Sequence, residues 1–196
     1  RTILFNRDDD PDVLWSVSAD GGAAVRLGPT ARFSALFSPD GSRIVRTAIR
    51  DVNGQGTFTP EIVLADGAPA GLTPALPPRM VNLRWPPDGN GVTYSHASND
   101  FKNLYRVRLD GSAPQELTRF TEGRIIRHAW SPDGRWIAFQ RPYGQVYVVH
   151  PDGTGLRRIP LNLPAGAGAL NPTWSPDGAW IAFALQQREQ SSIYMV

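Results

Sequence analysis

Trp174-Ser175-Pro176-Asp177-Gly178 is the stretch that decides the fold, because the chain repeats it with small changes. Related stretches occur at residues 130–134, 85–89 and 37–41. The aspartates of the four stretches, at positions 40, 88, 133 and 177, are 48, 45 and 44 residues apart. A second dipeptide, Asp-Gly, alternates with them at positions 20, 66, 110 and 152. Self-similarity with a period of about 40–50 residues is typical of β-propeller blades.

The Ser-Pro-Asp-Gly sequence predicts a type I turn, since Ser favours its first position, Pro presets φ at the second and Gly suits the fourth. A left-handed Gly then supplies the bulge that lets such a turn join antiparallel strands. Apolar strand patterns flank each turn, and a third strand leads into each Asp-Gly dipeptide before a short fourth one. We therefore expect an all-β propeller of four-stranded antiparallel blades, with eighteen strands in total.

The repeat divides one domain, residues 1–196, into blade units at about 1–30, 31–78, 79–123, 124–168 and 169–196. The first unit begins with a second strand and the last ends with a third strand. We therefore expect about four and a half blades of a propeller that is incomplete at both ends. Its open blade edges would need cover from missing sequence or from another chain. The start at Arg1, without Met or a signal peptide, predicts a missing natural N-terminus.

Composition narrows the possible functions. The chain has no cysteine, which excludes disulfides and cysteine-based metal or redox sites. No apolar run approaches the roughly 18 residues of a membrane helix. Its net charge is +2, and Lys102 is the one lysine among the 20 basic residues. Eight of the aspartates lie in the repeated turns, which topology places on one rim, so we expect that rim to be acidic and the other surfaces to be relatively basic.

The repeated run Trp-Ser-Pro-Asp-Gly-x-Trp-Ile-Ala-Phe, then an Ile-Tyr-x-Val strand and an x-Asp-Gly turn, resembles the WD-repeat-like blades of TolB β-propellers. Blades of this kind also occur in the propellers of prolyl-oligopeptidase-type proteases. The resemblance covers nearly the whole chain and is clearest around Asp133 and Asp177. It is weaker around Asp40, where Phe37 replaces Trp, and Arg43 and Arg46 replace apolar residues.

The resemblance to TolB implies a non-enzymatic, protein-binding scaffold in the periplasm or at the exterior of a bacterial cell. Its partner would be another protein of the envelope or surface. Two alternatives remain open: the gating propeller of a prolyl-oligopeptidase-type serine protease whose catalytic domain is missing here, and a structural subunit of a surface assembly. The sequence has no Gly-x-Ser-x-Gly elbow, no phosphate-binding loop and no His-Glu-x-x-His. We expect no enzymatic activity, cofactor, metal, nucleic acid or membrane insertion.

Loops between second and third strands lie on the rim opposite the repeated turns, and we expect a partner to bind there. These loops are predicted at residues 7–12, 50–60, 98–102, 141–144 and 186–191. The candidate partner-binding residues on this loop face are Arg7, Asp8, Asp10, Arg50, Asp51, Asn53, Asp100, Phe101, Lys102, Tyr143 and Arg188. The residues expected to build the turns are Asp40, Gly41, Asp88, Gly89, Asp133, Gly134, Asp177 and Gly178.

Other residues have more ordinary interpretations. Trp85, Trp130 and Trp174 recur in register, which predicts packing between blades rather than a stacking platform. Asp8, Asp10 and Asp12 have the spacing that opens a calcium loop, but Val13 stands where such a loop needs Gly, so a solvated hairpin is expected. His128 should lie on an innermost strand, where a hydrogen-bonded structural histidine is expected rather than a base.

Overall fold

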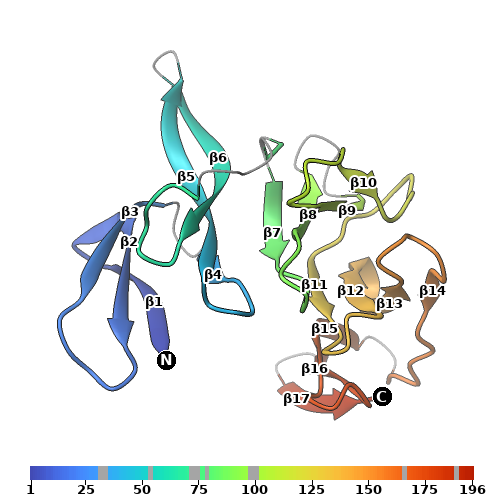
Figure 1. Ribbon diagram of the computed structural model, residues 1–196. Coiled ribbons are helices and arrows are strands. Elements are labelled where there is room, and N and C mark those ends of the chain that lie inside the picture. The colour runs from blue at the N-terminus through green and yellow to red at the C-terminus, as the bar shows by residue number, and fades with distance from the viewer. Residues whose placement is uncertain are drawn as a thin grey trace.

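The computed structural model describes residues 1–30, 35–52, 55–70, 76–77, 80–96, 102–164, 167–187 and 190–196, with the backbone alone for residues 49–52, 55–58, 187 and 190. In these ranges, 17 strands form five antiparallel sheets (Figure 1). The architecture is therefore an all-β, incomplete propeller in which each sheet is one blade. Among the described residues, no helix is long and apolar enough to cross a membrane.

The sheets follow one another in chain order and are named A to E here. Sheet A holds β1 (Thr2–Arg7), β2 (Asp10–Ser18) and β3 (Val25–Pro29), and sheet B holds β4 (Ala35–Phe37), β5 (Arg43–Val52) and β6 (Gln55–Leu64). Sheet C holds β7 (Met80–Arg84), β8 (Val92–His96), β9 (Leu104–Val107) and β10 (Gln115–Glu116). Sheet D holds β11 (Arg127–Trp130), β12 (Ile137–Arg141), β13 (Gln145–Val149) and β14 (Arg157–Arg158), with the 3-10 turn η2 (Pro142–Gly144) after β12. Sheet E holds β15 (Gly168–Trp174), β16 (Ile181–Gln187) and β17 (Gln190–Met195).

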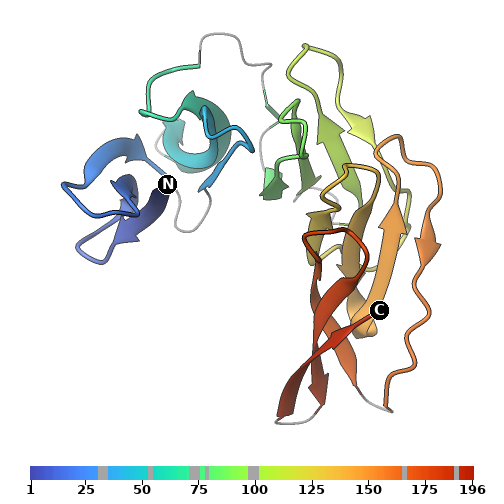
Figure 2. The ribbon, with the colours of Figure 1, turned by 60° about the horizontal axis from the view of Figure 1, so that its bottom comes forward.

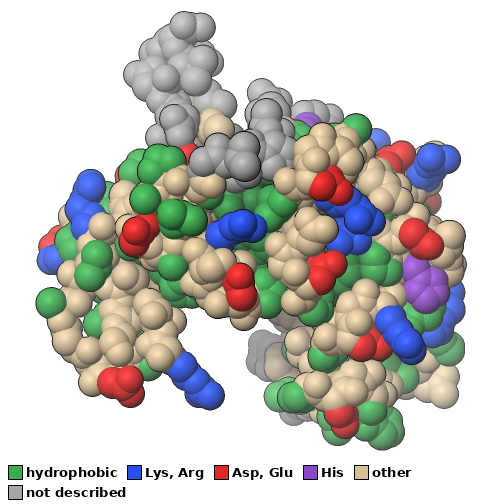
Figure 3. Space-filling model, viewed as in Figure 1, with side chains coloured by type: hydrophobic (Ala, Val, Ile, Leu, Met, Phe, Trp, Pro, Cys, Tyr) green, Lys and Arg blue, Asp and Glu red, His purple; other side chains and the backbone are tan. Residues whose placement is uncertain are grey.

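The sheets stand beside one another along an arc. The first strands β4, β7, β11 and β15 lie on its inner side, as Figures 1 and 2 show. The space-filling view shows a hollow on the open side of the arc, between sheet A and sheet E (Figure 3). Acidic and basic side chains are interspersed on the face seen there rather than gathered by sign.

The Ser-Pro-Asp-Gly turn is closed by short-range hydrogen bonds. In sheet D, Ser131 Oγ donates to Asp133 Oδ1 (2.6 Å), and the same carboxylate accepts the amide of Arg135 (3.0 Å). Trp136 N donates to Ser131 Oγ (2.9 Å), and Gly134 N donates to Ser131 O (3.0 Å) with a φ of 71° at Gly134. Equivalent contacts close the turns at residues 38–43 and 175–180. Because every partner lies within five residues, the motif specifies its own turn.

The same hydrogen bonds hold the turn carboxylates in their charged form. The hydroxyl of Ser38 contributes most to lowering the pKa of Asp40, to about 2, and serine hydroxyls likewise lower the pKa of Asp133 and Asp177. In sheet C, Pro86 takes the place of the serine, and the Asp88 carboxylate still accepts the amide of Asn90 (2.9 Å). The glycines of the remaining turns also have positive φ: Gly41 72°, Gly89 65° and Gly178 72°.

The core lies between sheets rather than within any one of them. Four apolar clusters are found, and each joins two neighbouring sheets. Between sheets A and B, for example, Leu14 and Leu27 meet Ile44 and Val63. Between sheets D and E, Val148 belongs to the same cluster as residues of β16. Each sheet therefore depends on its neighbours to bury its apolar faces, as in other repeat architectures.

The tryptophan before each turn links its blade to the preceding one. Trp85 Nε1 donates to Leu36 O (3.0 Å) and Trp174 Nε1 donates to Ala129 O (3.2 Å). Trp130 Nε1 donates to the Thr93 hydroxyl (2.9 Å). These indoles thus combine inter-blade packing with a directional hydrogen bond.

Arg46 makes the corresponding link in sheet B, where Phe37 has no N–H to donate. Its guanidinium is buried, donates to Leu27 O in sheet A (2.8 Å) and pairs with Glu61 (2.7 Å). Arg46 therefore supplies the link to the preceding sheet that Phe37 cannot make.

Three predicted loops are wrong in extent, because strands continue into them. The expected loop 50–60 is mostly strand, with β5 and β6 paired as far as Val52 and Gln55. In the same way, pairing reaches Arg7 and Asp10 in sheet A. It reaches Gln187 and Gln190 in sheet E. These strand ends are polar and project beyond the core, so no apolar alternation marks them, although Asn-Gly at 53–54 is a strong hairpin signal.

The expected fourth strand of the 31–78 unit is also wrong as far as the structure describes it. In residues 66–70 it consists of a single bridge between Val63 and Pro69. Proline has no N–H to give to a ladder, and this segment contains several prolines.

We expect Trp174→Phe to lower the free energy of unfolding by about 1 kcal/mol, because it removes the inter-blade hydrogen bond that the indole donates to Ala129 O. Urea denaturation followed by circular dichroism would measure the change. Trp180→Phe is the matched control, since Trp180 is 53% exposed, and it should change stability by less than about 0.5 kcal/mol. Equal losses in the two variants would contradict the role assigned to the indole.

Candidate functional site

The predicted loop-face residues are distributed over several blades. Arg7 ends β1, pairs with Asp9 (2.6 Å) and lies over the Trp15 ring at 5.1 Å. Asp8 is in the exposed turn that follows, and Asp10 begins β2 opposite Arg7.

The other predicted residues lie in sheets B to E. Arg50 and Asp51 belong to β5, where only the backbone is described. Lys102 precedes β9, and Tyr143 lies in η2. The predicted residues Asn53, Asp100, Phe101 and Arg188 lie outside the described residues. The described members therefore do not form one cluster, and Tyr143 has the most unusual environment.

Tyr143 is held in a strained and exposed position. It has φ 61° and ψ 29°, a left-handed conformation that costs a non-glycine residue roughly 1–2 kcal/mol. Its side chain projects into solvent, and the residue is 93% exposed. Strained conformations of this kind cluster at functional sites.

Close packing of the next residue fixes this turn. Gly144 has φ 65°, and a Cβ placed on it would lie 2.3 Å from the Cα of Gly168 at the start of β15. The turn is therefore pressed against sheet E and has little room to relax.

A groove of about 200 Å³ adjoins Tyr143 at the junction of sheets D and E. One wall is the η2 turn with Gln145, and the other is the connection from β14 to β15. The apolar residues of that second wall are Ile159, Leu161, Leu163, Pro164 and Ala167. Among the described residues of the lining, Arg158 is the one that carries a charge, and the surface exposed in the groove is mostly polar.

Arg141 supports the turn from the side of sheet C. Its guanidinium lies 3.7 Å from the centre of the Phe120 ring, and its Nη2 donates to Glu122 O. The Phe120 amide in turn donates to Asn103 Oδ1 (2.7 Å). A cation over an aromatic face is attracted to it, so Arg141 braces the end of β12 just before η2.

His128 is buried inside the junction of sheets C and D. Its Nε2 lies 2.8 Å from Thr93 Oγ1, the hydroxyl that also accepts the Trp130 indole N–H. Its Nδ1 has no hydrogen-bond partner among the described residues. Burial lowers the pKa of His128 to about 3, and the charge of Arg84 adds to this effect. His128 is thus a neutral structural residue here.

Sequence reasoning missed two residues on the opposite rim, Arg106 of β9 and Arg108, which follows that strand. Basic side chains therefore lie among the turn aspartates. The signal was present in the repeat: Arg106 occupies a position that is apolar in sheets B, D and E.

Among the described residues, no group of three His, Cys, Asp or Glu side chains is placed to hold a metal ion. Asp8, Asp10 and Asp12 therefore form no such group.

Solved structures with the same fold include TolB proteins and an oligogalacturonate lyase. A TolB-like protein from Agrobacterium tumefaciens matches with a TM-score of 0.68 and 22% identity, over 100% of this chain and 76% of its own. An oligogalacturonate lyase in complex with manganese matches with a TM-score of 0.69 and 15% identity, over 100% of this chain and 59% of its own. TolB from Acinetobacter baumannii matches with a TM-score of 0.62 and 16% identity, over 99% of this chain and 51% of its own.

No protein-family model and no curated protein sequence matches the chain. The structural matches give the chain a TolB-like propeller fold, and identities this low carry no more than the fold.

We expect Gly144→Ala to destabilise the protein by about 3 kcal/mol, because the new methyl group would overlap the backbone of β15 at a positive φ. Tyr143→Gly, one residue earlier, should change stability by less than about 1 kcal/mol, since relief of backbone strain offsets the greater freedom of the unfolded chain. Urea denaturation of both variants tests the packing of the turn. A Gly144→Ala protein as stable as the parent would disprove it.

We expect acid to weaken the fold through His128. The unfolded histidine gains a proton as pH falls through about 6.5, whereas the folded one stays neutral until about pH 3. Its stabilising contribution is therefore complete above pH 6.5 and should fall by about 2 kcal/mol by pH 5.

Urea denaturation at pH 7 and pH 5 would measure this loss, with His128→Gln as the variant that keeps a nitrogen near Thr93 but does not titrate. A variant with the same pH dependence as the parent would rule out His128 as its source.

Proposed function

We propose that the chain is a non-enzymatic scaffold that binds another protein on its loop face, in the periplasm or at the exterior of a bacterial cell. The binding surface is centred on Tyr143 and the groove at the junction of sheets D and E. The observation that carries this proposal is the exposed tyrosine held in a left-handed turn.

Tyr143 has the properties of a binding anchor. Tyrosine is enriched among the residues that dominate protein interfaces, because a rigid ring with a polar tip buries a large area at low entropic cost. The turn is braced by Gly144 against Gly168 and by Arg141 against Phe120. The ring is therefore presented from a fixed base, which reduces the entropy lost on binding.

The groove indicates the chemistry of the partner. The surface that it exposes is mostly polar, which suits hydrogen bonds to a partner backbone, and Arg158 at its side suits a carboxylate. We therefore expect an extended partner segment that carries an acidic residue. The setting in the cell envelope rests on the TolB-like fold and on the Ser-Pro-Asp-Gly blades.

Site-specific photocrosslinking would test the proposal. A photoreactive phenylalanine analogue placed at position 143 should crosslink one protein in envelope extracts of the source cells, and the same analogue at position 180, on the opposite rim, should not. With that protein purified, Tyr143→Ala should weaken its binding at least tenfold by isothermal titration calorimetry.

Leu156→Ala is the matched control, because Leu156 is an exposed apolar residue on the turn rim. It should bind as the parent does. Identical crosslinks from positions 143 and 180, or unchanged affinity of Tyr143→Ala, would refute the loop face as the docking surface.

A further inference from the structure

The junction of sheets C and D differs from its neighbours at one pair of facing positions. In each of sheets B to E, the residue five positions after the turn aspartate lies on the second strand and pairs with a residue of the third strand. The pair is Val45 with Ile62 in sheet B, Ala138 with Val148 in sheet D and Ala182 with Met195 in sheet E. In sheet C the same pair is Thr93 with Arg106. Two polar side chains thus replace an apolar pair.

The Arg106 guanidinium is buried with few partners. Its side chain is 7% exposed, and its Nη2 lies 3.4 Å from Asp88 Oδ2, on a carboxylate that is itself 59% exposed. Its Nε has no hydrogen-bond partner among the described residues. The guanidinium lies over the Trp130 ring at 5.4 Å. A buried charge with an unpaired donor is unfavourable unless another group satisfies it.

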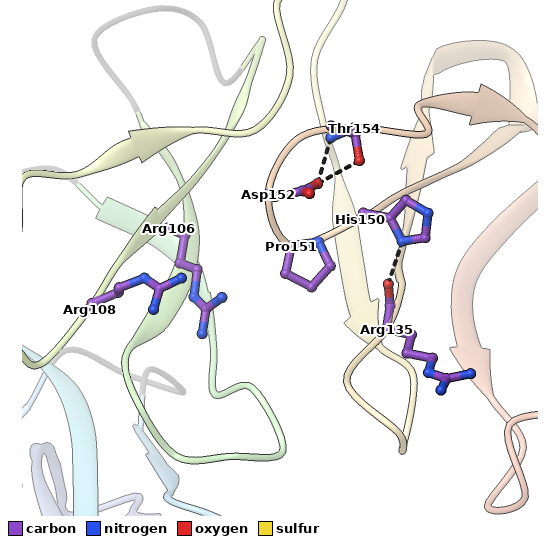
Figure 4. Close-up of a pocket in the computed structure, with 7 residues that line it drawn as sticks. All are labelled: Arg106, Arg108, Arg135, His150, Pro151, Asp152 and Thr154. Carbon is purple, nitrogen blue, oxygen red and sulfur yellow. Dashed lines mark hydrogen bonds between the residues drawn. The ribbon is translucent and has the colours of Figure 1, made fainter.

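The unsatisfied guanidinium borders a cavity of about 530 Å³ that opens on the turn rim. Figure 4 shows Arg106 and Arg108 extending from β9 toward the turn that carries Pro151 and Asp152. The positive charge of Arg108 is close enough to contribute, after burial, to a lowered pKa of Arg106. Two like charges placed together in this way favour an anion between them.

The one acidic residue of the lining is already engaged. Asp152 accepts the amide (2.8 Å) and hydroxyl (2.7 Å) of Thr154, and these bonds lower its pKa. Its carboxylate therefore already has hydrogen-bond partners within its own turn. His150 is likewise held, because its Nδ1 bonds Arg135 O (2.9 Å) and its ring stacks on Trp136.

We propose that this cavity, the Arg106 pocket, binds a carboxylate through Arg106 and Arg108. The guanidinium groups of Arg106 and Arg108 would donate to the carboxylate oxygens, and Pro151 would contact the rest of the ligand. The pocket lies on the turn rim, opposite the loop face, so this inference is independent of the proposed function.

A carboxylate fits the charges better than a phosphate does. Arg106 is partly balanced by Asp88, and Asp152 faces the same cavity. With Asp110 also acting on Arg106, the charges of this set are close to balanced, so one added negative charge disturbs them less than the two charges of a phosphate dianion would. Planar guanidinium and carboxylate groups also match in geometry. The volume is within the range of small-molecule pockets, so the ligand can be larger than acetate.

Calorimetric titration of the whole chain would test the proposal with four probes at constant ionic strength: succinate, the peptide Ala-Ala-Ala, its C-terminal amide and inorganic phosphate. We expect at least one of the two carboxylates to bind, and the amide and phosphate to bind at least tenfold more weakly. Binding of succinate alone would identify a small free carboxylate, and binding of the peptide alone a chain terminus. The Arg106 Nε–H resonance, assigned by its absence in Arg106→Met, should shift on binding.

Arg106→Met is the decisive variant, because methionine occupies the same position in sheet E and should fit without loss of stability. It should weaken carboxylate binding at least tenfold while the denaturation midpoint stays equal or rises. Arg108→Gln should also weaken binding. Arg135→Gln is the matched control and should stay within twofold, since its side chain points away from Arg106 and Arg108 in Figure 4.

The proposal would be overturned if neither carboxylate bound, if phosphate bound as tightly as they do, or if Arg106→Met kept the parent affinity.

Discussion

Burial between neighbouring sheets is the constraint on which the rest of the structure depends. Each of the four apolar clusters contains residues of two sheets, so no blade has a core of its own. The indoles of Trp85, Trp130 and Trp174 add a hydrogen bond to three of these contacts, and Arg46 adds one to the contact between sheets A and B. The hydrogen bonds within each turn matter because they fix the position of the tryptophan that precedes the turn. The hydroxyl and carboxylate of the turn orient the strand pair that carries the indole toward the preceding blade.

Much of this fold could be predicted because its signals are short-range. Within each Ser-Pro-Asp-Gly turn the hydrogen-bond partners are at most five residues apart, so the motif carries the geometry with it. The length of the β5–β6 hairpin could not be predicted in the same way, because its outer residues are polar and have no apolar face to mark their register. At Pro69 the opposite error occurs, because a strand is expected and the described residues form a single bridge. A strand needs N–H groups for its ladder, and proline lacks one.

The candidate sites were less predictable, because each depends on contacts between distant segments. Tyr143 could be placed on the loop face from topology, but its left-handed conformation follows from the approach of Gly144 to Gly168 in the next blade. Nothing in the local sequence around Arg106 indicates that its side chain is buried. Its burial follows from the position of Trp130 in the adjacent sheet.

The replacement of an apolar pair by Thr93 and Arg106 shows how a functional position can be recognised within a repeat protein and transferred to another blade. The blades are copies within one molecule, and each therefore acts as an aligned relative of the others, even when no second sequence is compared. A position that departs from its apolar counterparts in sheets B, D and E is marked as individual by the chain itself. Ala138 and Val148 occupy the equivalent positions at the next junction. Replacing them with threonine and arginine could therefore create a second pocket in the same scaffold.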